Sequence, residues 1–160
     1  NRFLTSGGLG TMGYGLGASM GAQFANPKNR VVMITGDGSF KMNFNEIITA
    51  VKHKLPIKIF VMNNNALGMV RQWQNLFYED RFSSTDLQED IEYVGFAKSL
   101  GAEGFVINTV DDIDQVIEQA FSSDKVSVIN CLVATESNVY PMVPPGKAIH
   151  EAIGKFEDLE

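Results

Sequence analysis

The sequence predicts an α/β domain built on a doubly wound parallel sheet with helices on both faces. Short apolar runs alternate along the chain with helical patterns, and this order implies right-handed crossovers between parallel strands. The composition, 44% hydrophobic and 20% charged over 160 residues, is typical of a globular domain. We expect a single domain over residues 1–160, with a proline-containing C-terminal tail at residues 138–160.

Four runs have the continuous apolar character of strands that are buried on both faces. They are VVMIT (31–35), IKIFVM (57–62), GFVI (104–107) and VSVINCLVA (126–134). In such sheets ligands bind beyond the carboxyl ends of the strands, so the residues that follow these runs are the first candidates for a site.

A glycine-rich segment, TSGGLGTMGYGLGASMGAQ (5–23), precedes the first strand. Its spacing places Gly13, Gly17 and Gly21 on one helical face, where another backbone can approach closely. A flexible linker is the alternative. It is disfavoured because large apolar residues interleave the glycines where Ser or other polar residues are expected.

The helix expected after the first strand has apolar residues at i, i+3, i+4, i+7 and i+11 from Phe44 to Leu55. Asn43 stands three residues before Glu46, and we interpret the two as a capping pair at the start of this helix. Two more helices are expected, at residues 91–100 before Gly101 and at residues 113–121 after a Thr109-x-x-Asp112 start signal.

The charge balance argues against two classes of partner. With a net charge of −6 and a pI near 4.9, the chain lacks the clustered Lys and Arg that nucleic acid or an anionic membrane surface requires. No apolar run approaches the roughly 18 residues that a membrane-spanning helix needs. An anionic ligand must therefore be held by backbone N–H groups or by a bridging metal ion.

The single cysteine and the two histidines predict no metal cluster. Cys131 alone excludes an internal disulfide framework and a Cys-cluster zinc site, and its strand-like surroundings predict a buried, inert thiol. His53 and His150 stand apart from other potential ligands. The chain begins at Asn1 without an initiator Met, so we expect a piece of a longer protein whose N-terminus carries no targeting information.

Two polar motifs follow the first two strands. Gly36-Asp37-Gly38 ends the first and Asn63-Asn64 ends the second, with a gap of 24 residues between the two motifs. If the strands are neighbours, a carboxylate, an amide oxygen and a turn carbonyl meet there, and these are the hard oxygens that Mg²⁺ accepts beside phosphate and water. Each motif alone is an ordinary turn, but together at this spacing they predict a metal–diphosphate site.

Residues 8–13 also fit the dinucleotide pattern G-x-G-x-x-G, and Asp37 lies roughly where such a fold places its ribose-binding acid. The match is weak, because no complete strand precedes the glycines and Asp37 stands between two of them. A nicotinamide-dependent dehydrogenase domain is therefore one alternative. A non-catalytic interaction module without metal–diphosphate affinity is another.

The spacing of the two polar motifs resembles the thiamine-diphosphate signature. With LGMVRQWQNLFYEDRFSSTDL and VYPMVPPGKAI, these segments resemble the C-terminal diphosphate-binding domain of acetolactate synthase (acetohydroxyacid synthase) catalytic subunits of the biosynthetic type, over about residues 2–149. The resemblance implies the thiamine-diphosphate-binding fold. Other thiamine lyases and oxidases are alternatives (catabolic acetolactate synthase, glyoxylate carboligase, pyruvate oxidase), and VRQWQNLFYE favours the biosynthetic synthase.

The resemblance also implies residue roles. The Asp37 and Asn64 side chains and the Ala66 carbonyl would bind Mg²⁺. Gly10 would offer its carbonyl to the aminopyrimidine ring of thiamine diphosphate, and Met12 would be the apolar wedge that bends this cofactor. The remaining cofactor contacts implied are Gly36, Gly38, Ser39, Gly68 and Met69.

Trp73 resembles a tryptophan at the substrate entrance that favours a larger second 2-oxo acid. Core packing explains the same residue as well, because Met69, Val70, Trp73 and Phe77 recur at helical spacing. Both interpretations stay open at this point.

In complete enzymes of this kind, pyruvate is decarboxylated and the hydroxyethyl carbanion condenses with a second 2-oxo acid to give acetolactate or acetohydroxybutyrate in branched-chain amino-acid biosynthesis. The family's catalytic glutamate belongs to the N-terminal domain of a second subunit, so no catalytic residue is expected in this chain. The family's FAD-binding domain is not expected in it either. We therefore expect an inactive half of an active site.

The resemblance implies further partners: small 2-oxo acids, a homodimer or tetramer, and a small regulatory subunit. It implies a cytoplasmic enzyme, with a preceding transit peptide left open. Residues 66–85 and 138–147 are expected near the carboxyl edge of the sheet, where they would close over the cofactor and exclude water.

Overall fold

The computed structural model describes residues 2–87 and 91–154. Its sheet has the strand order β1-β2-β4-β3, and every pairing is parallel. All four expected strands are confirmed to within two residues. Their bounds are β1 (Val32–Gly36), β2 (Lys58–Asn63), β3 (Glu103–Ile107) and β4 (Ser127–Leu132).

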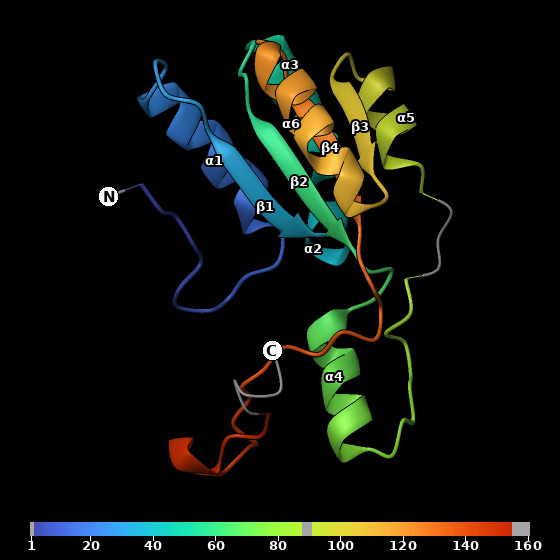
Figure 1. The fold of residues 1–160 in the computed structure, drawn as a ribbon. Helices are drawn as coiled ribbons and strands as arrows, with labels where there is room; N and C mark the ends of the chain where they lie inside the picture. The colour runs from blue at the N-terminus through green and yellow to red at the C-terminus, as the bar shows by residue number, and fades with distance from the viewer. Residues whose placement is uncertain (1, 88–90, 155–160) are drawn as a thin grey trace.

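Helices cover both faces of this sheet, which confirms the predicted doubly wound fold (Figure 1). One face carries α1 (Tyr14–Ala25), α2 (Asp37–Lys41), α3 (Ile47–Lys52) and α5 (Tyr93–Ser99), and the other carries α6 (Ile113–Ser122). The remaining helix, α4 (Gly68–Phe77), lies beyond the carboxyl ends of β1 and β2, next to the C-terminal segment (Figure 1). No helix in the described ranges is both long and apolar enough to cross a bilayer.

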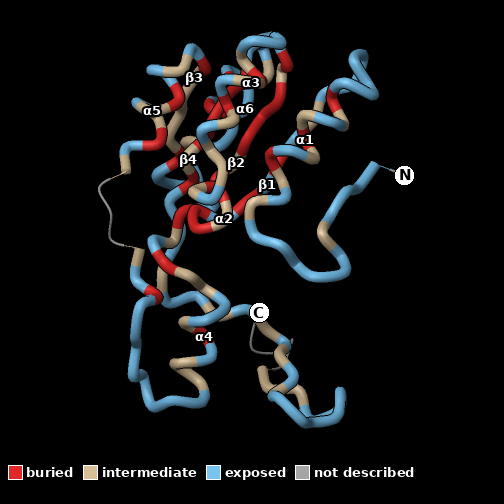
Figure 2. Tube along the Cα trace, turned by 180° about the vertical axis from the view of Figure 1, so that it is seen from behind, coloured by how far each residue is buried: buried red, intermediate tan, exposed pale blue. Residues whose placement is uncertain are grey.

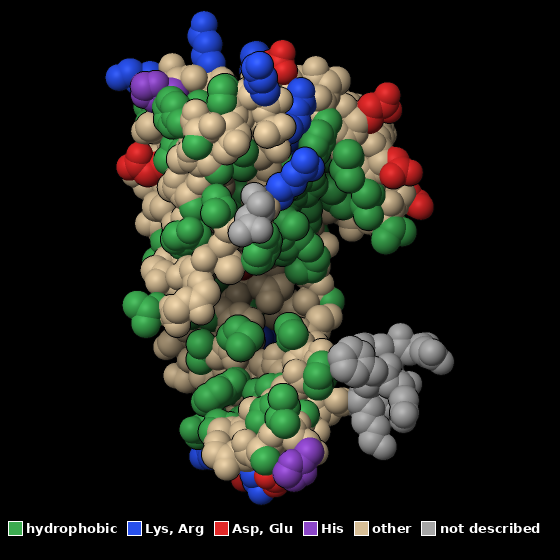
Figure 3. Space-filling view, turned by 90° about the vertical axis from the view of Figure 1, so that its left-hand side faces the viewer, with side chains coloured by type: hydrophobic (Ala, Val, Ile, Leu, Met, Phe, Trp, Pro, Cys, Tyr) green, Lys and Arg blue, Asp and Glu red, His purple; other side chains and the backbone are tan. Residues whose placement is uncertain are grey.

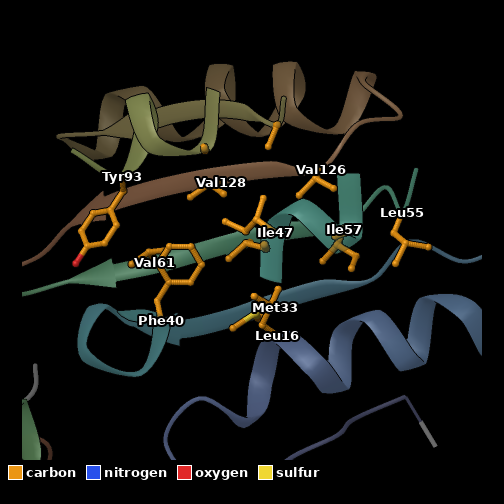
Figure 4. Close-up of a cluster of buried hydrophobic side chains, with 14 residues drawn as sticks. Leu16, Met33, Phe40, Ile47, Leu55, Ile57, Val61, Tyr93, Val126 and Val128 are labelled. Atoms are coloured by element: carbon orange, nitrogen blue, oxygen red, sulfur yellow. The ribbon is translucent and has the colours of Figure 1, made fainter. Parts of the chain in front are cut away.

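The larger core lies between the sheet and the face that carries four helices (Figure 4). Phe40 of α2 belongs to it, and its ring lies 5.8 Å from the ring of Tyr93 in α5. Phe40 comes three residues after Asp37, so its burial ties the turn at the end of β1 to a close-packed interior. In Figure 2 the buried residues concentrate in this layer, whereas α4 and the C-terminal segment are largely exposed.

The smaller core lies under α6, where Ile129 and Cys131 of β4 pack against Ala120. Burial raises the pKa of the Cys131 thiol, and the predicted buried cysteine is confirmed. On this face α6 leaves β1 uncovered, because Ile34 is 75% exposed. Among the described residues β1 forms one edge of the sheet, and Figure 3 shows hydrophobic side chains gathered on this side of the molecule.

The prediction for the glycine-rich segment is partly wrong. Gly13 stands just before α1 with φ 84°, in the left-handed region, rather than within the helix. Side chains added at Gly17 and Gly21 would meet nothing within 4 Å, so no backbone approaches that face among the described residues. The close approach occurs at Gly15, where a Cβ would lie 2.8 Å from the Met33 side chain.

The predicted capping pair of Asn43 and Glu46 does not form. The Asn43 amide donates to the carbonyl of Gly13, and the Glu46 carboxylate accepts from the Thr49 hydroxyl. A tertiary partner has therefore replaced the local one. The single helix expected over residues 44–55 is also divided, into the short 3₁₀ helix η1 (Phe44–Glu46) and α3.

The other boundary signals are confirmed. Asp112 accepts a 2.9 Å hydrogen bond from the backbone N–H of Thr109, ahead of α6, and this bond helps to lower the pKa of its carboxyl group. Gly101, with φ 90°, follows α5. Two further 3₁₀ helices are η2 (Val110–Asp112) and η3 (Ile149–Glu151).

Candidate functional site

Asp37 is the buried acid at the carboxyl end of β1. It is 2% exposed, and its Oδ1 accepts a 2.9 Å hydrogen bond from the N–H of Gly38. Its Oδ2 is buried without a partner among the described residues. Burial raises the pKa of Asp37, and the backbone N–H groups of Gly38 and Asn65 oppose this shift. A buried carboxylate oxygen with no donor is suited to a cation.

The asparagine turn lies beside this carboxylate. Gly36 is in register with Met62, so the residue after β1 lies level with the end of β2. Asn64 Oδ1 accepts from the N–H of Ala66 at 3.1 Å, and the hydroxyl of Thr135, beyond β4, donates to the Asn64 carbonyl at 2.8 Å. The predicted meeting of the two motifs at neighbouring strand ends is therefore confirmed.

Side chains pack closely against the glycines of both turns. A Cβ on Gly38 would lie 2.9 Å from the Leu67 side chain, and a Cβ on Gly68 would lie 2.9 Å from Nδ2 of Asn64. The segment that holds Ala66 is fixed from its other side, because the N–H of Leu67 donates to the carbonyl of Thr85. The turn is thus held in place with its backbone close to the GDG motif.

The donor set fits Mg²⁺. No group of three or more His, Cys, Asp or Glu that could hold a metal exists in residues 2–87 and 91–154. A metal here must instead use one carboxylate from Asp37, the amide oxygen of Asn64 and the backbone carbonyl of Ala66, with the rest of the octahedron from ligand phosphate and water. Their assignment as ligands stays a prediction.

The loop with Gly10 and Met12 approaches the same turn. Met12 Cε lies 3.3 Å from the position a Cβ would occupy on Gly38. Ser39 Oγ accepts a 2.9 Å hydrogen bond from the N–H of Gly13, which leaves its own hydroxyl hydrogen available to a ligand. Gly10 is exposed, with φ 60°. The structure therefore brings both halves of the predicted cofactor site together, and their cofactor contacts stay predictions.

Met69 and Trp73 lie on α4, apart from the main core. Trp73 is 43% exposed and Met69 is more exposed still, so core packing within this chain is the wrong explanation for their helical spacing. Trp73 lines a cavity of about 550 Å³ with Val70, Gln74, Tyr78 and Arg81. This setting is compatible with a substrate contact, which is untested.

Two residues hold segments of the site in place without a clear signal in the sequence. The spacing of Asn43 to Glu46 predicts a helix cap, and nothing in it indicates the distant partner Gly13. Gln72 in α4 is buried, and its side chain both donates to and accepts from the backbone of Val139. Nothing in the sequence distinguishes it from its polar neighbours. Through this pair of bonds α4 holds the C-terminal segment, and both lie at the carboxyl edge as predicted (Figure 1).

Comparison with known proteins gives a consistent result. Residues 1–131 match the family described as "Thiamine pyrophosphate enzyme, C-terminal TPP binding domain". The acetolactate synthase large subunit of Cyanidium caldarium is 42% identical over 160 residues, which are 99% of this chain and 27% of the relative. The acetolactate synthase isozyme 2 large subunit of Escherichia coli K12 is 42% identical over 96% of this chain and 28% of its own length.

A solved structure is similar as well. The thiamine diphosphate-dependent 4-hydroxybenzoylformate decarboxylase of Rhodococcus jostii RHA1 superposes with a TM-score of 0.72 and 26% identity, over 78% of this chain and 24% of that chain. This chain spans only about a quarter of the length of these relatives.

Proposed function

Since the chain belongs to the thiamine pyrophosphate enzyme family, as its C-terminal TPP-binding domain, we propose that it holds the diphosphate of thiamine diphosphate through Mg²⁺. The observation that carries this proposal is the buried, unpartnered Oδ2 of Asp37 beside the asparagine turn. In an acidic chain this arrangement lets an anionic diphosphate group bind without a basic patch, because the metal supplies the positive charge.

Each residue has one role in this proposal. Asp37, Asn64 and the Ala66 carbonyl bind Mg²⁺, and the backbone of Gly36 and Gly38, with Ser39 and Gly68, lies against the diphosphate. Gly10, Met12 and Met69 place the ring system of the cofactor.

For the complete protein we propose acetolactate synthase activity. Pyruvate and a second 2-oxo acid give acetolactate or acetohydroxybutyrate, with release of CO₂. Bound thiamine diphosphate supplies the electron sink for the decarboxylation. This chain orients the cofactor and shields it from water, and Trp73 contacts the second 2-oxo acid. The 42% identity to acetolactate synthase large subunits favours this activity over that of the decarboxylase, at 26%.

Other parts of the proposed enzyme lie outside this chain. They are a catalytic glutamate on a second subunit, an FAD-binding domain, a homodimeric or tetrameric assembly and a small regulatory subunit, in the cytoplasm. The nicotinamide alternative is disfavoured, because no strand precedes the glycines among residues 2–13 and the Asp37 carboxylate is buried against the asparagine turn.

The test is an assay of the purified full-length protein with pyruvate, with and without Mg²⁺ and thiamine diphosphate. We expect acetolactate that depends on both. Acetaldehyde and CO₂ without acetolactate would indicate a simple decarboxylase, and NAD-dependent turnover would contradict the proposal altogether. Residues 1–160 alone should form no acetolactate, since loss of the glutamate as proton-transfer group costs on the order of 10²–10⁴-fold.

A further inference from the structure

Gly13 is the point at which the loop of Gly10 and Met12 is fastened to the chain that follows Asp37. Its N–H donates to Ser39 Oγ at 2.9 Å, and its carbonyl accepts from Asn43 Nδ2 at 2.8 Å. Both backbone polar groups of one residue are therefore held by side chains from α2 and the turn after it.

The rest of the loop supplies its own hydrogen bonds. The N–H of Gly10 donates to the carbonyl of Ser6, and the N–H of Thr11 donates to the Ser6 hydroxyl. These bonds shape the loop but do not fix its position relative to the GDG turn. Among the described residues, the pair of hydrogen bonds at Gly13 joins the loop to the chain that follows the GDG turn.

The backbone at Gly13 has little room to move. Gly13 has φ 84°, and a Cβ there would lie 2.9 Å from Cβ of Met42, the residue before Asn43. Immediately beyond Gly13, α1 begins and buries Leu16 in the main core. Loss of the Asn43 bond should therefore displace the end of the loop more than α1, because the buried Leu16 anchors the helix.

The Asn43 side chain makes no capping hydrogen bond to η1, and its Oδ1 is buried without a partner among the described residues. Buried amide oxygens are rarely left unpaired, so such a group calls for an explanation in the site around it. The reason here is that the Asn43 Nδ2 donates to the Gly13 carbonyl, and this bond fixes the direction in which the Oδ1 of the same amide points.

We propose that Asn43 is a positioning residue that sets the distance between the two halves of the cofactor site. It acts through Gly13 on the loop of Gly10 and Met12, and it does not touch the diphosphate end at Asp37. This inference rests on the proposed function. It predicts that loss of Asn43 weakens the binding of thiamine diphosphate but not of inorganic diphosphate. Loss of a metal ligand should weaken the binding of both.

The test compares two ligands on the full-length protein by calorimetry: inorganic diphosphate with Mg²⁺, and thiamine diphosphate with Mg²⁺. In Asn43→Ala we expect the affinity for inorganic diphosphate to stay within about threefold of the wild type. The affinity for thiamine diphosphate should fall by about 10–100-fold, the usual effect of losing a supporting hydrogen bond behind a ligand site.

Asn43→Asp serves as a second variant, because it keeps the volume of the side chain and turns an acceptor toward the Gly13 carbonyl. It should show the same separation even if Asn43→Ala does not fold. The matched control is Asn45→Ala, an exposed asparagine two residues away, which should bind both ligands like the wild type.

Equal losses for both ligands, or no loss for either, would overturn the role of Asn43. A wild-type protein that binds no thiamine diphosphate with Mg²⁺ would instead overturn the proposed function. The two failures are therefore distinguishable.

Discussion

The two ends of the sheet each bury a charged side chain, and they treat it in opposite ways. At the amino end, Lys58 is fully buried, and its Nζ donates to the carbonyls of Ser123 and Lys125 at 2.8 and 2.7 Å and to Ser127 Oγ at 3.0 Å. All three ammonium hydrogens thus have acceptors. At the carboxyl end, Asp37 keeps one buried oxygen without a donor.

The difference separates a structural charge from a functional one. A further ligand does not stabilise a buried ion whose hydrogen bonds are complete. A buried carboxylate with an oxygen that lacks a donor is instead stabilised when a cation binds to it. Burial alone therefore does not identify a site, since Lys58 and Asp37 are about equally inaccessible. What identifies it is the unmatched oxygen, with the asparagine turn beside it.

The largest effect is expected for Asp37, at the carboxyl end of the sheet. Asp37→Asn in the full-length protein should lower the affinity for thiamine diphosphate with Mg²⁺ by at least about 100-fold, more than loss of an outer-shell partner, because a direct oxygen ligand and its charge are lost. Its unfolding free energy should stay the same or rise, since a desolvated charge is removed. Calorimetry and urea unfolding measure the two quantities.

Asn64→Ala should lose cofactor affinity in the same way. The control is Asp114→Asn on α6, an exposed acid whose replacement should leave the cofactor affinity unchanged. Unaltered affinity in both site variants would contradict the metal assignment.

The opposite pattern is expected for Lys58, at the amino end of the sheet, where stability should change and cofactor affinity should not. Lys58→Met should lower the unfolding free energy by about 1–3 kcal/mol, because the carbonyls of Ser123 and Lys125 lose their donor. Cofactor affinity should stay within about twofold. Urea unfolding checks the first quantity, with the exposed Lys52→Met as the control.

The pH dependence sharpens this result. Burial, followed by the charge of Arg30, lowers the pKa of Lys58 below 10.5, so the folded state binds this proton less tightly than the unfolded state. The contribution of Lys58 to stability should therefore rise as the pH increases toward 10.5, and Lys58→Met should lack this rise. A variant as stable as the wild type at every pH would contradict a structural role for the charge.

The smallest effect concerns exchange of backbone amides. Adding thiamine diphosphate with Mg²⁺ to the full-length protein should slow exchange by about tenfold in residues 66–85 and 138–147, which Gln72 joins through Val139. Residues 123–127, at the amino end, should not change. Equal protection of the first two segments in both states would rule out a lid that the cofactor orders.

Sequence patterns predicted the sheet well because its central strands β2 and β4 are largely buried on both faces, where continuous apolar runs leave few alternatives. The Thr109–Asp112 box was predictable for a similar reason, since its partners are three residues apart. Asn43 has the same spacing to Glu46 but bonds to Gly13, 30 residues earlier in the chain. A choice between local and distant partners depends on packing that one sequence does not display.

The candidate site was predictable to the same degree. Asp37 and Asn64 follow strands that were expected to be parallel, so their meeting could be predicted on the condition that the two strands are neighbours, which the structure confirms. Trp73 could not be assigned, because helical spacing indicates an apolar face and not what covers it. Its exposure in the structure excludes this chain's own core.

The open side of β1 has a practical consequence for anyone who prepares this domain by itself. Ile34 projects from an edge strand that offers its backbone to any neighbour, and nothing charged interrupts VVMIT. Edges of this kind join molecule to molecule as concentration rises. The isolated domain should therefore self-associate in concentrated solution, and light scattering would detect this as an increase in particle size.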